Sequence, residues 1–312
     1  MASTGIGFGK TILFGEHFVV YGLPSIASAI ESKTVATVER SGKYELVDNR
    51  LETPGYKKEK FDQQVDSTRR VFEAVKIDPA KTPVKITLAG DLIAASGVGA
   101  SAASCVAIAR ALSKEFNLNL NEEQINAAAY EGEKGYHGTP SGIDNTVSTY
   151  GGLIWFKKGT PPLMERISMR QPAEIIIADT GITSDTAAVV ADVKKSKEAD
   201  PAKFEKLFSE EEALAKKARA ALESSDLPLV GKLMDENHAL LQKIGVSCPE
   251  LEDLVSTAKN AGAIGAKLTG TGRGGNIVAL TPGKQLQEQV AKAIEAKGFR
   301  ALRTRIGIKP PE

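Results

Sequence analysis

The sequence predicts a two-domain protein in which strands and helices are mixed along the whole chain. Its 312 residues exceed what a single hydrophobic core usually holds, so two domains are expected. Short apolar runs typical of strands alternate with longer runs of helical periodicity. The composition changes at Lys157–Pro162, where lysine, glycine and proline indicate a linker. We therefore expect one domain over residues 1–160 and a second over residues 161–312.

Strands are predicted where short apolar runs are bounded by polar residues, and helices where apolar residues recur every three or four positions. Asn121 is a suitable N-cap with Gln124 at capping-box spacing, and Gly298 closes the last helix. The expected strands are Thr11–Phe14, Thr34–Glu39, Val84–Ala89, Gly152–Phe156, Glu174–Asp179, Ala266–Thr269 and Asn276–Leu280. The expected helices are Val65–Val75, Ser101–Phe116, Glu122–Lys134, Ala202–Leu222, Leu227–Lys243, Pro249–Ala261 and Lys284–Lys297.

Composition excludes several classes of function. The net charge of +1 gives no field that would favour nucleic acid or an anionic membrane. The chain has no run of 18 apolar residues and its N-terminus lacks the features of a signal peptide. Cys105 and Cys248 form neither a disulfide framework nor a CxxC metal pair. These observations predict a cytoplasmic protein with no nucleic-acid or membrane partner.

A small-residue loop, Ser96–Ser101, is the most informative segment because it leads directly into an apolar helix. The N–H groups at a helix start have no helical partners, and the helix dipole adds positive potential there. Glycine lets an anion approach the backbone closely, so phosphate is the expected ligand. The alternative is a tight turn that serves only close packing of the helix.

The loop differs from two well-known phosphate-binding motifs. A Walker A motif has Lys-Ser or Lys-Thr after its last glycine, where this chain has Ala100 and Ser101. A dinucleotide-binding fingerprint needs an acidic residue about 20 positions on, at the end of a second strand. Glu115 is the nearest candidate, and it falls within a predicted helix.

Charged residues stand among apolar ones near the N-terminus. Lys10 follows a glycine at the start of a strand, where it is either solvated or placed beside a phosphate or a catalytic acid. Glu16 and His17 precede the apolar run Phe18–Tyr21 and need partners if they are buried. For His17 alone, a hydrogen-bonded imidazole in the core is the simpler interpretation.

Two acidic residues suit phosphoryl-transfer chemistry. Glu133 lies four residues after Ala129 and eight after Ile125, so it shares the apolar face of its helix. There it is either paired, bound to a cation, or exposed at a frayed helix end. Asp144 follows the loop Gly138–Gly142, whose glycine, proline and serine residues indicate a defined turn. It is either a helix N-cap or a carboxylate that accepts a hydroxyl proton.

The segment Gly265–Gly275 lies between two expected strands and is mostly glycine in its second half. Because glycine weakens strands, we expect the loop to admit a close approach by a ligand, with a long hairpin turn as the alternative. A phosphate loop, a lysine, two acids and a second glycine-rich loop together indicate a phosphotransferase.

These segments, in this order, resemble the GHMP small-molecule kinases. Within that superfamily, Lys10–Gly22 and the stretch from Glu133 to Gly152 are similar to the mevalonate kinase family. The resemblance implies an α+β fold of two domains with the active site between them. It also implies an N-terminal domain like domain 2 of ribosomal protein S5 and a ferredoxin-like C-terminal domain.

The resemblance implies a role for each matching residue. Asp144 would be the catalytic acid-base, and Lys10 beside it would stabilise charge on the transferred phosphoryl group. Ser101 and Glu133 would bind Mg²⁺, with ATP phosphates completing its coordination. The residues implied to bind ATP are Ser96, Gly97, Val98, Gly99, Ala100, Ser101 and Ala102. The residues implied on the substrate side are Glu16, His17, Thr186 and Gly270.

The chain departs from the family pattern at several positions. Ala100 removes a hydroxyl from the phosphate loop, and Thr271 and Arg273 interrupt the late glycine-rich loop. Ser184 stands where family members carry an arginine near the substrate carboxylate. These departures affect carboxylate recognition more than phosphoryl chemistry.

The implied activity is ATP- and Mg²⁺-dependent phosphorylation of the 5-hydroxyl of mevalonate in isoprenoid synthesis. The resemblance also implies a homodimer. One alternative is another GHMP kinase that acts on phosphomevalonate, homoserine or a sugar. The other is a GHMP-fold regulator that binds nucleotide without catalysis.

Overall fold

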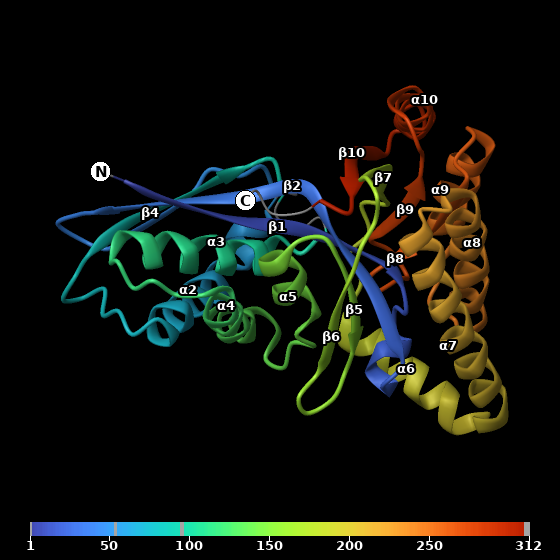
Figure 1. The fold of residues 1–312 in the computed structure, drawn as a ribbon, viewed down its shortest axis with the longest axis horizontal. Coiled ribbons are helices and arrows are strands. Elements are labelled where there is room, and N and C mark those ends of the chain that lie inside the picture. Colours follow the sequence, from blue (N-terminus) through green and yellow to red (C-terminus); the bar gives the residue numbers. More distant parts are fainter. Residues whose placement is uncertain (1, 53–54, 94–96, 309–312) are drawn as a thin grey trace. The chain divides into compact units, whose positions relative to one another are not determined.

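The computed structural model describes residues 2–52, 55–93 and 97–308, which form two compact units (Figure 1). The first unit contains the described residues up to Lys10 and from 29 to 151. The second unit contains Thr11–Ser28 and Gly152–Ile308. The predicted domain boundary at residue 160 remains a prediction. Near the N-terminus the chain passes from the first unit into the second and back again, at residues 10 and 28.

The first unit packs helices on a small sheet. Residues Thr34–Arg40 of one long strand pair antiparallel with β4, and β4 pairs parallel with β3. Apolar side chains of this sheet, including Val38 and Ile86, form a core with Phe72, Val106 and Leu112 from the helices. Strands β1 (Ser3–Phe14) and β2 (Pro24–Arg40) lie partly in the second unit, whereas β3 (Glu45–Asp48) and β4 (Val84–Gly90) lie wholly in the first. The helices are α1 (Tyr56–Glu59), α2 (Phe61–Ala74), α3 (Ala100–Glu115), α4 (Glu122–His137) and α5 (Ile143–Tyr150).

Strand β1 packs directly on α3 because alternate residues of the strand are glycine. A Cβ atom at Gly5 would lie 2.2 Å from the carbonyl oxygen of Ala107, and one at Gly7 would lie 2.0 Å from that of Ala103. The sequence predicted a strand only from Thr11, since glycine lowers strand propensity. The structure extends it back to Ser3, and so holds the strand that carries Lys10 against α3.

The second unit contains a four-stranded antiparallel arrangement in the order β10-β7-β9-β8. Helices connect β7 to β8, and α10 connects β9 to β10, which is the split βαβ topology of a ferredoxin-like fold and confirms that prediction. In Figure 1, α8 and α9 lie beside β8 and β9. The strands are β5 (Leu153–Lys157), β6 (Leu163–Ile167), β7 (Ala173–Asp179), β8 (Gly265–Thr269), β9 (Asn276–Leu280) and β10 (Arg300–Ile306). The helices are α6 (Thr186–Ala199), α7 (Pro201–Ser224), α8 (Leu227–Lys243), α9 (Pro249–Asn260), α10 (Lys284–Glu295) and a short 3-10 helix, Phe18–Tyr21.

Sequence reasoning was wrong about the segment Lys157–Pro162. It was expected to link two domains, but β5 and β6 pair antiparallel on either side of it, so it forms the turn of a hairpin. Strands β3, β6 and β10 and helix α6 were not predicted. Helix α6 begins where the Asp185 carboxylate accepts hydrogen bonds from the backbone N–H groups of Ala187 and Ala188.

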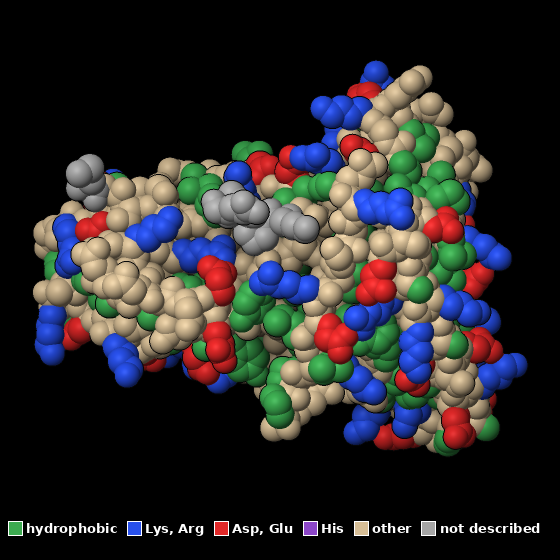
Figure 2. Space-filling view, in the orientation of Figure 1, with side chains coloured by type: hydrophobic (Ala, Val, Ile, Leu, Met, Phe, Trp, Pro, Cys, Tyr) green, Lys and Arg blue, Asp and Glu red, His purple; other side chains and the backbone are tan. Residues whose placement is uncertain are grey.

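The expected capping box of α4 is confirmed. The Asn121 side chain accepts a hydrogen bond from the Gln124 backbone, and the Gln124 side chain accepts one from the Asn121 backbone. Within the described ranges, none of the helices has the length and apolar character needed to cross a bilayer. On the face drawn in Figure 2, Lys and Arg side chains are interspersed with Asp and Glu.

Candidate active site

The loop Ser96–Ser101, predicted to bind phosphate and called the phosphate loop below, leads into the start of α3. Gly97 and Gly99 have φ values of 67° and 74°, in the left-handed region that glycine adopts readily. Gly99 is the N-cap of α3, and no side chain of the described residues caps the first turn. The N–H groups of this turn can therefore bind an anion, as the sequence predicted. Ser96, also predicted to bind ATP, lies outside the described residues.

Lys10 is fixed against this loop by its backbone as well as its side chain. Its backbone N–H donates to the carbonyl oxygen of Val98 at 2.8 Å. A Cβ atom on Gly99 would come within 2.8 Å of the Lys10 Cγ, so only glycine allows the lysine stem to pass the helix start. Lys10 Nζ lies 3.3 Å from Asp144 Oδ2, and the Asp144 side chain remains 29 % exposed. The structure thus brings together the predicted catalytic pair.

Asp144 lies in the first turn of α5, but Gly142 rather than Asp144 is the N-cap of that helix. The side chain makes no capping hydrogen bond, so the N-cap interpretation of Asp144 does not hold. Its carboxylate is oriented by the ion pair with Lys10 and remains open to a ligand.

Glu133 lies on the buried face of α4, as its spacing predicted, and is 1 % exposed. Burial, and next the charge of Asp144, raise the pKa of this carboxyl to about 8, while the Ser101 hydroxyl and Lys10 act in the opposite direction. Among the described residues, Glu133 Oε1 has no hydrogen-bond partner. A buried carboxylate with an unpartnered oxygen is stabilised by a cation.

The donor set suits a cation that is shared with a phosphate ligand. Nowhere in the described part of the chain do three or more His, Cys, Asp or Glu side chains form a metal-binding group. Mg²⁺ at phosphate sites usually needs only one or two protein oxygens, since phosphate and water supply the rest. Ser101 and Glu133 provide two such oxygens, and Ser101 is near enough to lower the pKa of Glu133, so these residues fit Mg²⁺.

The second unit gathers three of the residues predicted on the substrate side. His17 has a φ of 60°, and its Nε2 lies 2.6 Å from the carbonyl oxygen of Thr271. The hydroxyls of Thr186 and Thr271 are 2.8 Å apart. Gly270 adjoins Thr271, and a Cβ atom placed on it would meet nothing within 4 Å. Burial lowers the pKa of His17, so its imidazole is neutral near pH 7.

Glu16 is placed differently from the other predicted substrate-side residues. It is buried and forms an ion pair with Lys267, which is itself fully buried. Lys267 also donates to the carbonyl oxygen of Leu268 at 2.7 Å. Glu211 lies nearby, and Asn237 Nδ2 donates to its Oε2 at 2.6 Å. Glu16 therefore anchors the segment before His17 from within the core.

This buried cluster predicts a specific dependence of stability on pH. Burial, and next the charge of Glu16, raise the pKa of Glu211 from its usual 4.5 to about 8. Because the folded-state pKa is raised, Glu211 stabilises the fold fully below about pH 4.5 and loses this contribution as pH rises towards 8. The free energy of unfolding of the wild type, relative to that of Glu211→Gln, is expected to fall across this range and then level off.

Urea denaturation between pH 5 and 9 would measure this difference in unfolding free energy. Glu212→Gln is the matched control, since Glu212 is a partly exposed neighbour in the same helix and pairs with Lys216. Parallel pH profiles for the wild type and Glu211→Gln would contradict the assignment of a raised pKa to Glu211.

Sequence reasoning missed several polar residues that support the site. Arg50 lies in the first unit and donates to the carbonyl oxygen of Ala100 at the start of α3. Lys267 and Thr271 support Glu16 and His17 in the second unit. Arg273, noted as a departure from the family loop, forms an ion pair with Asp192. Arg50 stands in no recognisable motif. Thr271 could have been singled out from the sequence, because it interrupts a glycine-rich loop.

Comparison with known proteins identifies the family of the chain. A family model described as GHMP kinases N terminal domain matches residues 66–152, and one described as GHMP kinases C terminal matches residues 218–300. Mevalonate kinases of Pyrococcus abyssi and Pyrococcus horikoshii are each 36% identical, over 95% of this chain and 93% of theirs. The chain belongs to the mevalonate kinase family of GHMP kinases.

A solved structure of this mevalonate kinase family is also similar along nearly the whole chain. The crystal structure of L. major mevalonate kinase in complex with R-mevalonate is 41% identical and has a TM-score of 0.93. The match covers 97% of this chain and 95% of that one. Ser101, Glu133 and Asp144 lie within the N-terminal family match, whereas Lys10 and Arg50 precede it.

Proposed function

We propose that the protein transfers the γ-phosphoryl group of ATP to the primary 5-hydroxyl of mevalonate, giving 5-phosphomevalonate and ADP. The observation that carries this proposal is the Lys10–Asp144 pair, held at 3.3 Å beside the uncapped start of α3. The bond between the mevalonate oxygen and phosphorus forms as the bond from the γ-phosphorus to the β,γ-bridging oxygen breaks. The hydroxyl proton is lost to Asp144.

Asp144 orients and deprotonates the attacking hydroxyl, since its carboxylate is partly exposed and fixed by Lys10. Lys10 also offsets the negative charge that develops on the transferred group. Both residues act by position and charge, which is what phosphoryl transfer chiefly requires.

The phosphates of ATP bind the backbone N–H groups from Gly97 through Ala102, and Ser101 and Glu133 would hold Mg²⁺. The metal supplies neutralisation of phosphate charge when it is bound. Support for this assignment comes from the absence of a side-chain cap on α3 and from the unpartnered Oε1 of Glu133.

The mevalonate-side residues are His17, Thr186 and Gly270, to which Thr271 is added here because it contacts both His17 and Thr186. Glu16 acts by anchoring His17 through the buried pair with Lys267. A homodimer and a cytoplasmic location remain expectations of the family resemblance.

The test is an assay of ADP release by the purified protein with MgATP and a panel of acceptors. Mevalonate, homoserine, galactose and phosphomevalonate are compared at equal concentrations. Turnover is expected with mevalonate. Turnover only with another acceptor would overturn the substrate assignment, and nucleotide binding without turnover of any acceptor would favour a regulator.

A further inference from the structure

Arg50 is a buried arginine whose charge is matched by a neighbouring carboxylate. The residue is 5% exposed and the Asp48 side chain is 7% exposed. Arg50 Nε donates to Asp48 Oδ1 at 2.9 Å and Arg50 Nη2 donates to Asp48 Oδ2 at 2.6 Å. This two-point geometry fixes the plane of the guanidinium as well as its position.

The third nitrogen of the guanidinium faces the start of α3. Arg50 Nη1 donates to the Ala100 carbonyl oxygen at 3.1 Å and to Ser104 Oγ at 2.5 Å. The Ser104 hydroxyl also donates to the Ala100 carbonyl oxygen, at 2.8 Å. Ala100 is the first residue of α3 and directly precedes Ser101, so these bonds hold the turn that ends the phosphate loop.

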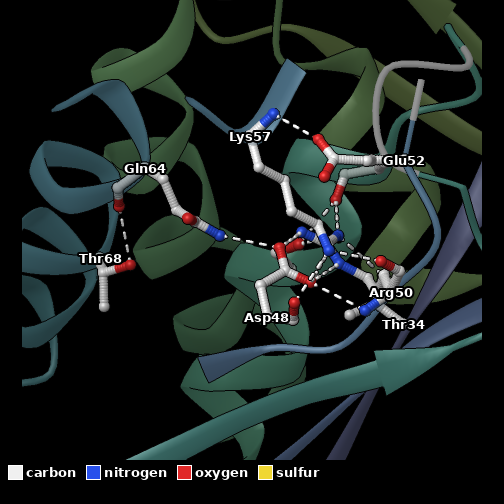
Figure 3. A network of polar contacts seen from close by, with 9 residues as sticks. Thr34, Asp48, Arg50, Glu52, Lys57, Gln64 and Thr68 are labelled. Carbon is white, nitrogen blue, oxygen red and sulfur yellow. Dashed lines mark hydrogen bonds and ion pairs between the residues drawn. The ribbon is translucent and has the colours of Figure 1, made fainter. Parts of the chain in front are cut away.

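The Asp48 carboxylate is in turn fixed by the segment that follows it. Figure 3 shows Gln64 and Arg50 converging on Asp48, and Gln64 Nε2 donates to Asp48 Oδ2 at 3.0 Å. Lys57 Nζ donates to the backbone carbonyl oxygens of Asp48 and Arg50. Contacts to Asp48 therefore fix the guanidinium independently of its hydrogen bonds to α3.

The alternative role for Arg50 is direct binding of phosphate. An unpaired cation at a helix N-terminus is unfavourable unless an anion neutralises it. Here Asp48 already supplies that anion, and the donors on Nη1 reach a carbonyl and a hydroxyl of α3. The contacts thus fit a residue that shapes the loop better than one that binds its ligand.

We propose that Arg50 is a positioning residue for nucleotide binding, which sets the first turn of α3 and with it the Ser101 hydroxyl and the N–H groups of the phosphate loop. This inference rests on the proposed function in that the loop is taken to bind the ATP phosphates. It predicts that substitution of Arg50 weakens the binding of the nucleotide and leaves the binding of the acceptor unchanged.

The test compares Arg50→Lys with the wild type, because lysine keeps the charge but cannot make the two-point contact. The Kd for MgADP, measured by calorimetry, and the KM for ATP are expected to rise at least about tenfold, as for other losses of a positioning partner. The KM for mevalonate is expected to stay within about twofold. Arg69→Lys is the matched control, since Arg69 is an exposed arginine on α2.

A second variant covers the case in which Arg50→Lys fails to fold. Ser104→Ala removes the hydroxyl that Arg50 contacts and leaves the Arg50–Asp48 pair in place. It is expected to weaken MgADP binding by less than Arg50→Lys, and in the double variant the two effects should not add. Unchanged MgADP affinity in Ser104→Ala and in any folded Arg50→Lys protein would overturn the proposal.

The two hypotheses fail in different ways. Wild-type protein that binds MgADP but does not phosphorylate mevalonate contradicts the proposed function, while weaker MgADP binding by Arg50→Lys still supports the role of Arg50. Loss of thermal stability in Arg50→Lys with equal rises in both KM values would instead indicate a merely structural role and overturn the inference.

Discussion

Replacing Asp144 by asparagine is expected to lower kcat for mevalonate by about 10²–10⁴-fold, the usual contribution of a positioned acid-base group. Asparagine has nearly the same shape but cannot accept the hydroxyl proton. The KM for ATP should change little, because Asp144 belongs to α5 and the phosphate loop precedes α3. Steady-state kinetics with MgATP and mevalonate measures both constants.

Asp62→Asn is the control for this experiment, since Asp62 is an exposed aspartate on α2 and in the same unit as Asp144. Circular dichroism would check that both variants fold. If Asp144→Asn retained turnover within about threefold of the wild type, Asp144 could not be the group that activates the hydroxyl.

Lys10→Met is expected to lower kcat by about 10²–10³-fold, the range seen when one donor to a developing negative charge is removed. Methionine keeps an unbranched stem that can pass Gly99, where the Lys10 side chain packs closely. The variant therefore removes the ammonium group while keeping the packing. It also leaves Asp144 without its partner at 3.3 Å.

The kinetic pattern shows where Lys10 acts. A fall in kcat with a nearly constant KM for ATP is expected if the ammonium stabilises the transition state more than the bound nucleotide. A rise in the KM for ATP alone would contradict this role and would make Lys10 a ground-state phosphate ligand. Lys43→Met serves as the control, since Lys43 is exposed and pairs only with Glu45 among the described contacts.

The sequence predicted the elements whose periodicity or capping is strong. Helix α4 has a capping box, and its apolar spacing predicts Glu133 on the buried face, where the structure places it. Strand β10 was missed because arginine occupies positions 300, 303 and 305, and its pairing with neighbouring strands, including β7, makes it a strand. Long-range pairing of this kind leaves little trace in local composition.

The candidate site divides in the same way. Lys10, Ser101, Glu133 and Asp144 stand in motifs, and the structure brings them together in the first unit. Arg50 could not be predicted, because its role depends on a contact with Ala100 that is distant in sequence. The buried ion pair of Glu16 with Lys267 likewise could not be predicted, because the two residues are 251 positions apart in the sequence.

Identification of the product by phosphorus NMR tests the central claim most directly. The protein is incubated with MgATP and mevalonate, and the new phosphate ester is examined for coupling to protons. Transfer to the primary 5-hydroxyl predicts a monoester signal split by the two protons of the adjacent methylene group, together with ADP. An unsplit ester signal, which the tertiary hydroxyl would give, or release of inorganic phosphate alone would contradict the account.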